Sequence, residues 1–188
     1  MHGFTYPLGL LLFSLWSCSG SVTEAQAESP LTRTQSSPAV EMQPGQPYAA
    51  GTRLRIPKGN ASFVIPVGWH AQLPEDSEAI IAVSESGAGF VMVFMILNMT
   101  EEELITLLGK PQPITHDLVF EPAGPVVKKG NRVTAAYEAG SLSGRALTVL
   151  GPDQQAVLFF LGRPRTESNQ PDQLLDDLAE STEFAAAK

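Results

Sequence analysis

Alternating polar and apolar residues begin at position 52 and predict a half-buried strand over residues 52–56. A second strand is expected over residues 62–65, after the turn signal P-K-G-N. Residues 79–84 and 90–97 are rich in strand-forming residues and flank a glycine-containing loop, so they predict a hairpin. Every residue from 90 to 97 is apolar. We therefore expect this run to be a central strand that is covered on both faces.

Two helices are predicted. Thr100 and Glu103 have the spacing of a capping box, in which each side chain satisfies a backbone N–H of the first turn. That helix should end at Gly109, just before a proline. The last helix is expected from about residue 171 to 182, because a proline suits its first position. Its apolar stripe consists of Leu174, Leu175 and Leu178.

Further strands follow the first helix. They are expected over residues 126–128, 132–138, 145–150 and 156–161, with residues 139–144 as one of the turns. His116 and Asp117 are expected to open another short strand. No internal repeat is evident. The pattern predicts an α+β fold, in which an antiparallel β-sheet meander has helices packed on its faces.

The start of the chain has the pattern of an export signal. Residues 8–17 form an apolar run that is too short to span a bilayer permanently but suits the hydrophobic region of a signal peptide. The next residue is Cys18, and the sequence L-W-S-C at 15–18 resembles the lipobox of bacterial lipoproteins. In that family the cysteine becomes the first mature residue and carries the lipid. The resemblance implies a signal peptide over residues 1–17 and lipidation of Cys18.

A second cleavage site stays open as an alternative. Residues 25–27 read A-Q-A, a small-x-small pattern that ordinary signal peptidase cuts. Cleavage after Ala27 would give a secreted or periplasmic soluble protein. With lipidation, we expect a protein anchored in the bacterial cell envelope. Ser19 follows the cysteine, and the resemblance then suggests the outer membrane, facing the periplasm, over the inner membrane.

The stretch after Cys18 separates this signal from the folded part. It is rich in Ser, Thr, Gln, Ala and Pro and lacks a sustained apolar period. Such a composition buries too little apolar surface to offset its ordering entropy, so residues 18–47 are predicted to be a flexible tether. The globular domain is expected over residues 48–188, as a monomer.

Composition and charge exclude several classes of function. The formal net charge is −8, which disfavours nucleic acid as a partner, because binding a phosphate backbone needs clustered Lys and Arg. It also disfavours electrostatic adhesion to anionic lipid. Cys18 is the only cysteine. The folded part therefore has no thiol for a disulfide, a redox pair or a cysteine zinc site.

One short motif resembles a known family. Residues 63–69 read F-V-I-P-V-G-W, similar to the F-x-x-P-x-G-W opening strand of the PsbP/Mog1-like superfamily, which includes DcrB-type bacterial proteins. The resemblance covers about residues 52–184 and implies an α/β/α sandwich. Members of that superfamily serve as photosystem accessory subunits, GTPase-binding factors, secretion-effector chaperones and uncharacterised lipoproteins. The resemblance therefore implies a fold and leaves the function open.

The chain offers no recognisable catalytic or metal motif. His70 and His116 are the only histidines of the predicted domain, and neither has the spacing of a zinc site. Residues 140–144 fail the nucleophile-elbow pattern, because Leu142 stands where the serine is needed. We expect no cofactor and no metal. An enzyme would need a dispersed carboxylate site, for which the candidates are Glu75, Asp76, Asp117 and Glu121. We expect these four to be solvated and far apart.

Trp69 is the best single candidate for a functional residue. Its favoured interpretation is a core anchor, because an aromatic ring buries a large apolar area. The alternative places it on the floor of a partner groove. The sequence thus predicts a non-enzymatic lipoprotein of the cell envelope that presents a protein-binding or scaffolding module. The alternatives are a chaperone- or inhibitor-type module that shields another protein, and the enzyme with dispersed carboxylates.

Overall fold

The protein is described by a computed structural model that covers residues 38–167 and 173–186. The chain divides into two compact units, Met1–Gln35 and Ser36–Lys188. The predicted signal peptide and Cys18 lie outside the described residues, as does most of the predicted tether. The description below concerns the second unit.

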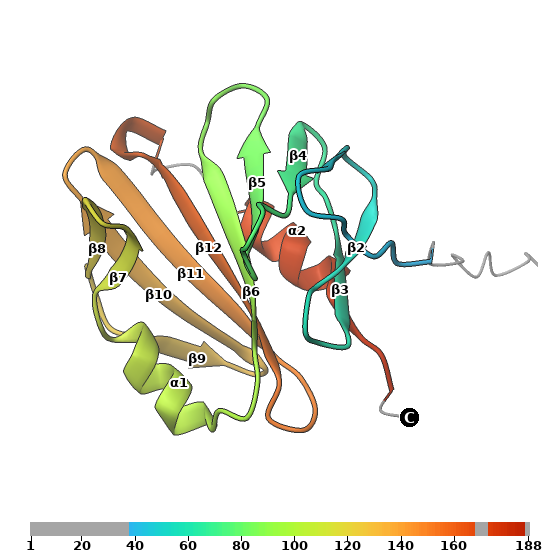
Figure 1. The fold of residues 1–188 in the computed structure, drawn as a ribbon. Coiled ribbons are helices and arrows are strands. Elements are labelled where there is room, and N and C mark those ends of the chain that lie inside the picture. The colour runs from blue at the N-terminus through green and yellow to red at the C-terminus, as the bar shows by residue number, and fades with distance from the viewer. Residues whose placement is uncertain (1–37, 168–172, 187–188) are drawn as a thin grey trace, which may run out of the picture. The chain divides into compact units, whose positions relative to one another are not determined.

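The second unit is built mostly of antiparallel β-sheet with two α-helices, in agreement with the predicted α+β class (Figure 1). The larger sheet has the order β1-β4-β5-β6-β12-β11-β10-β8-β7, and β9 also pairs with β10. A three-stranded sheet has the order β13-β3-β2. The strands of the larger sheet are β1 (Pro47–Tyr48), β4 (Trp69–Gln72), β5 (Ile80–Ser84), β6 (Phe90–Ile96), β7 (Gln112–Thr115), β8 (Leu118–Pro122), β9 (Val127–Lys129), β10 (Arg132–Ala139), β11 (Leu142–Leu150) and β12 (Ala156–Pro164). Those of the smaller sheet are β2 (Arg53–Arg55), β3 (Ala61–Val64) and β13 (Glu183–Phe184).

Both predicted helices are present as α1 (Glu101–Leu108) and α2 (Gln173–Ser181), and a short 3-10 turn, η1 (Arg165–Glu167), follows β12. The capping box is confirmed. The backbone N–H of Thr100 donates to Glu103 Oε2 at 2.8 Å, and the backbone N–H of Glu103 donates to Thr100 Oγ1 at 3.3 Å. The hydrogen bond from the Thr100 backbone, and a second from the Thr100 hydroxyl to the same Glu103 oxygen at 2.8 Å, hold the pKa of Glu103 below its ordinary value. Gly109 is the C-cap, as predicted.

The predicted hairpin is formed by β5 and β6, and β6 lies between β5 and β12 inside the larger sheet. Val91 and Val93 of β6 are buried, while its other side chains are partly buried. The central position of β6 is confirmed, but the expected cover on both faces is only partial, because Phe90, Met92, Phe94 and Ile96 stay partly exposed on the face opposite Val91 and Val93.

The core forms two clusters that use alternate residues of β12. Val157, Phe159 and Leu161 belong to the first cluster, whereas Leu158 and Phe160 belong to the second. Successive side chains of a strand point to opposite faces, so the two clusters lie on the two faces of the larger sheet. The first cluster includes buried leucines of α2 and residues of β2 and β3. The second includes buried leucines of α1 and residues of the β7–β8 hairpin.

Two local features differ from the sequence analysis. His116 and Asp117 form the turn of the β7–β8 hairpin, where a strand was expected to open. The turn predicted over residues 139–144 contains only Gly140 and Ser141, because β10 and β11 pair as far as Ala139 and Leu142. The positive φ of Gly140, 57°, permits this tight connection.

Residues 38–48, at the end of the predicted tether, are joined to both sheets. The backbone N–H of Val40 donates to the carbonyl of Arg53 at 2.9 Å, and the N–H of Arg55 donates back to the carbonyl of Val40 at 2.9 Å. Further along, the N–H of Gly45 donates to the carbonyl of Leu73 at 2.8 Å, before β1 pairs with β4. The backbone hydrogen bonds of the second unit therefore include residues from Val40 onward, several positions before residue 48.

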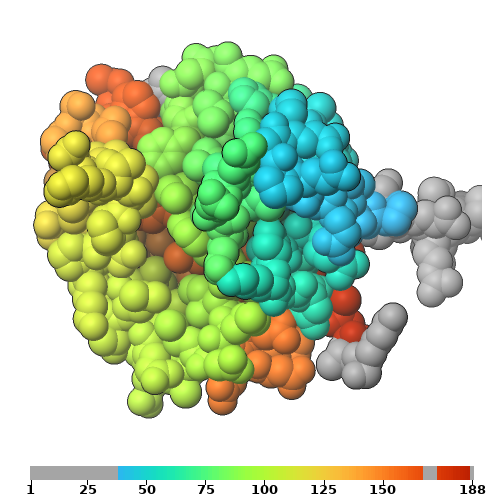
Figure 2. All heavy atoms as spheres, viewed as in Figure 1, coloured from blue at the N-terminus to red at the C-terminus, as the bar shows by residue number. Residues whose placement is uncertain are grey.

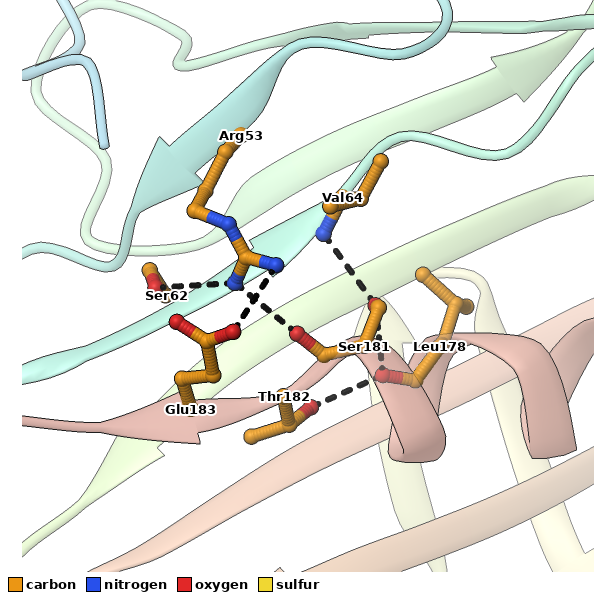
Figure 3. Close-up of polar contacts among 7 residues, drawn as sticks. All are labelled: Arg53, Ser62, Val64, Leu178, Ser181, Thr182 and Glu183. Atoms are coloured by element: carbon orange, nitrogen blue, oxygen red, sulfur yellow. Dashed lines mark hydrogen bonds and ion pairs between the residues drawn. The ribbon is translucent and has the colours of Figure 1, made fainter. Parts of the chain in front are cut away.

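A polar cluster centred on Arg53 joins the smaller sheet to the end of α2 (Figure 3). The guanidinium donates to the carbonyl of Ser181 at 3.0 Å and to Ser62 Oγ at 3.3 Å, and it pairs with Glu183 at 3.1 Å. Ser181 Oγ accepts from the backbone N–H of Val64 at 3.1 Å. Because the Arg53 side chain is only 11% exposed, solvent screens this cluster less than a surface ion pair.

Ionisation of Tyr137 should lower the stability of the fold at alkaline pH. Its hydroxyl donates to the carbonyl of Leu108, the last residue of α1, at 2.5 Å. Burial raises the pKa of Tyr137 to about 12. The folded state therefore keeps a proton that the unfolded chain releases near pH 10, so the free energy of unfolding should fall between pH 10 and about 12.

We expect Tyr137→Phe to remove this part of the alkaline fall, at the cost of one buried hydrogen bond, about 1 kcal/mol at neutral pH. Urea denaturation of both proteins between pH 8 and 11.5 measures the effect. Parallel pH profiles for the wild type and the variant would contradict it.

Candidate functional site

The carboxylates and histidines that the sequence offered for catalysis or metal binding lie at the surface. Glu75, Asp76, Asp117 and Glu121 are all exposed, as the sequence analysis expected. His70 and His116 are exposed as well. Within residues 38–167 and 173–186, no group of three or more His, Cys, Asp or Glu side chains is placed to hold a metal ion. No helix in these same ranges is long and apolar enough to cross a membrane.

Trp69 is neither a fully buried anchor nor a free surface residue. It opens β4, pairs with Ser84 of β5 and is partly buried against the first core cluster. The turn before it depends on Gly68, whose φ of 80° favours glycine. The carbonyl of Gly68 accepts from the backbone N–H of Glu85 at 2.9 Å. The turn and the β5–β6 loop therefore fix the backbone at Trp69, and the indole packs against the first core cluster.

An exposed apolar side chain stands beside this indole. Val67 is 92% exposed at the tip of the turn between β3 and β4, the highest value among the large apolar residues that the structure shows at the surface. Leu174, at the start of α2, is partly buried against the same core cluster. Val67, Trp69 and Leu174 all line each of two adjoining hollows. Together these two hollows are called the Trp69 groove below.

The two hollows continue in different directions from the shared residues. The first, of about 450 Å³, extends to the β5–β6 loop, the end of β12 and the first residue of α2. Its polar lining includes Ser84, Glu85, Ser86, Arg163 and Gln173. The second, of about 500 Å³, extends along α2 past Asp177 and Ser181 and is closed on the other side by Val64 and Pro66. Such volumes suit a few side chains of a partner.

One carboxylate lines each hollow. Glu85 belongs to the first and Asp177 to the second, and both are exposed. The amide of Gln173 donates to Asp177 Oδ1 at 2.8 Å. Among the ion pairs of the described residues, none involves Glu85 or Asp177. Arg163, which also lines the first hollow, has an interaction partner of its own.

The structure has a second partly open apolar surface. Phe90, Met92, Phe94 and Ile96 of β6 pack against the second core cluster and remain partly exposed. Val83 of β5, paired with Phe90, is 38% exposed. Figure 2 shows the surface hollowed between the segment coloured for α1 and β7–β8 and the segment coloured for β5–β6, with later residues at its base. The side chains named for this β5–β6 surface are all apolar.

Sequence reasoning found Trp69 and missed the residues that surround it. Val67 stands in a Pro-x-Gly turn, where an apolar residue is a detectable sign of an exposed contact. Leu174 was assigned to the core stripe of the last helix, and in the structure it also reaches the groove. Glu85 and Asp177 carry no signal in the sequence, since the fold brings them to the groove from distant positions.

Comparison with known proteins gives structural likeness only. No protein-family model matches the chain, and no curated protein matches it. Among solved structures, cyanobacterial PsbP (CyanoP) from Synechocystis sp. PCC 6803 is similar, with 14% identity and a TM-score of 0.49. The match covers 74% of this chain and 92% of that one.

The Ran-binding protein Mog1p of Saccharomyces cerevisiae is similar at 11% identity and a TM-score of 0.45, over 73% of this chain and 96% of that one. A protein of Bacteroides thetaiotaomicron VPI-5482 is similar at 9% identity and a TM-score of 0.41, over 77% of this chain and 50% of that one. These likenesses concern the fold and assign no activity, ligand or partner.

Proposed function

We propose that this protein is a non-enzymatic lipoprotein of the bacterial cell envelope. Its domain, an α/β/α sandwich of the PsbP/Mog1-like kind, would bind a protein partner at the Trp69 groove. The observation that carries the proposal is the exposure of Val67, 92%, directly beside the partly exposed Trp69 and Leu174. Apolar residues gathered at a hollow around a tryptophan are typical of contact surfaces.

The exposed candidate carboxylates support a binding function over an enzymatic one. General acid–base catalysis needs titratable groups held in mutual reach in a cleft that perturbs their pKa. Glu75, Asp76, Asp117 and Glu121 are exposed side chains. The residues around Trp69 are apolar, amide and hydroxyl groups, with one carboxylate in each hollow and the guanidinium of Arg163 in the first. Such a lining suits recognition.

The sequence around Cys18 supports the anchoring part of the proposal. Lipidation at Cys18 would fix the chain to a membrane, and residues 19–37 would separate the anchor from the domain. We propose that the site is the outer membrane, on the periplasmic side; the inner membrane and a soluble periplasmic or secreted form are the alternatives.

Site-specific crosslinking tests the partner-binding function. A photoreactive amino acid introduced at position 67 should give an adduct of discrete mass in intact cells, because this position is exposed beside the groove. Position 119 is the matched control, since Val119 is also an exposed valine, at 40%, but lies on β8. The same adducts from both positions, or none from position 67, would contradict the proposed function.

A chaperone- or inhibitor-type module is the second candidate. The partly exposed Phe90, Met92, Phe94 and Ile96 favour it, because a wide apolar face suits an apolar segment of another protein. The photoreactive residue at position 83 distinguishes the two candidates. Adducts from position 83 and none from position 67 would assign the function to the β5–β6 surface.

A further inference from the structure

We infer that the Trp69 groove binds an extended protein segment in which an apolar side chain is flanked by Lys or Arg. This inference rests on the proposed function and names the chemistry of the partner. It is argued from the shape of the groove, from the charges of Glu85 and Asp177, and from the pairing of the other charges on α2.

The groove is preformed and apolar at its centre. Trp69 is fixed by its pairing with Ser84, and the turn before it is tied to the β5–β6 loop by the hydrogen bond from Glu85 N–H to the carbonyl of Gly68. Leu174 is held by the packing of α2 on the first core cluster. A partner side chain that enters here meets Trp69 and Leu174 already packed against the core, so ordering these two residues costs little conformational entropy.

Two carboxylates, Glu85 and Asp177, and one cation, Arg163, line the groove, and Arg163 has an interaction partner of its own. Glu85 and Asp177 are free of ion pairs in the described part of the chain, although they line the two ends of one continuous surface. The neighbouring positions of α2 behave differently, because Asp176 pairs with Arg132 at 2.9 Å and Glu180 lies 4.0 Å from the same guanidinium. Arg132 therefore compensates the charges of Asp176 and Glu180 within the protein, whereas Asp177 stays available to a cation of a partner.

Lysine and arginine fit both properties of this surface. Their alkyl stems pack on apolar surface while the charged end reaches a carboxylate. A cation over the face of a tryptophan gains further attraction from the ring. An anionic membrane surface has the opposite charge preference, because two carboxylates and a net charge of −8 would repel it. A basic and apolar protein segment is the ligand class that satisfies all of these groups.

Tryptophan fluorescence provides the test in the full chain. The sequence holds two tryptophans, Trp16 and Trp69, so Trp16→Phe leaves Trp69 as the only indole. The probe is a synthetic ten-residue peptide that alternates leucine and lysine, and the matched peptide carries glutamate at each lysine position. We expect saturable binding of the lysine peptide, with the emission of Trp69 moving to shorter wavelength. The glutamate peptide should bind at least tenfold more weakly.

Matched variants locate the charge effect. Glu85→Gln and Asp177→Asn should each weaken the lysine peptide about threefold, and both together about tenfold, with a smaller dependence on salt. Asp176→Asn is the control, because that carboxylate is already paired with Arg132 and does not line the Trp69 groove. It should leave the affinity unchanged. An equal loss in Asp176→Asn would mean that the general field of α2, and not the groove, attracts the peptide, which overturns the inference.

The remaining outcomes separate this inference from the proposed function. Equal affinity for both peptides, with both weakened by Val67→Ser, would overturn the cationic ligand class and retain the groove as a binding site. Absence of lysine-peptide binding, in a protein that still crosslinks a partner from position 67, has the same meaning. A shift of Trp69 emission on phosphatidylcholine vesicles without peptide would assign the surface to a membrane and overturn the inference.

Discussion

Phe159→Ala should lower the free energy of unfolding by about 3–5 kcal/mol, because it removes a fully buried ring and leaves a cavity. Phe159 lies on β12 in the larger sheet, and its ring centroid is 5.8 Å from that of Phe63 on β3 in the smaller sheet, at an interplanar angle of 77°. This edge-to-face pair is a direct contact between the two sheets. Urea denaturation, followed by Trp69 fluorescence and by far-UV circular dichroism, measures the loss.

Phe94→Ala is the matched control for this prediction. Phe94 is on β6, which pairs with β12, but its side chain is partly exposed. We expect Phe94→Ala to lower the free energy of unfolding by less than half as much, because folding removes less apolar area of this side chain from water. Equal losses in the two variants would contradict the prediction that the buried contact between the sheets makes Phe159 the more costly residue to remove.

Cys18→Ala should release the protein from the membrane or block its processing. Two or more acyl chains bind a membrane stably, whereas an unlipidated chain of this composition has no comparable attachment. Fractionation into membrane and soluble parts, with the intact mass of the mature protein, measures the result. A mature protein of unchanged mass and location in the variant would refute lipidation at Cys18.

A second variant separates the two cleavage sites. Ala27→Asp should block ordinary signal peptidase, which needs small residues at its site, and should leave processing at Cys18 unaffected. If the mature protein begins after position 27 in the wild type and fails to mature in Ala27→Asp, the protein is secreted in soluble form. The anchoring part of the proposed function is then wrong. That result does not bear on partner binding at the Trp69 groove.

Local signals in the sequence predicted several elements well. The capping box at Thr100 and Glu103 acts within four residues, so it needs no tertiary information, and both of its hydrogen bonds are present. The hairpin of β5 and β6 was predictable because its strands are neighbours in sequence and its loop contains two glycines. The burial of β12 on both faces agreed with the uninterrupted apolar run that begins at Ala156.

Elements that depend on distant contacts were not predictable. The chain near Val40 is polar and proline-rich, and it becomes ordered because β2 and β4 offer it backbone partners. The groove has the same origin. Glu85 and Asp177 are 92 positions apart in the sequence, and only the fold brings them to two adjoining hollows that share one tryptophan. A hydrophobic period of 2 or 3.6 residues indicates which face of a strand or helix is buried. It does not indicate against which other element that face packs.

The path of residues 38–48 determines where pulling would act on a tethered domain. A force that pulled the domain away from an anchor at Cys18 would act first on the two backbone hydrogen bonds between Val40 and β2. From β2 the load passes through the Arg53 guanidinium to the end of α2. If these bonds gave way, the hydrogen bond of Gly45 and the pairing of β1 with β4 would come under tension next. In an anchored protein the attachment would thus consist of two successive sets of hydrogen bonds, and the first could break and lengthen the connection to the anchor while the larger sheet stays intact.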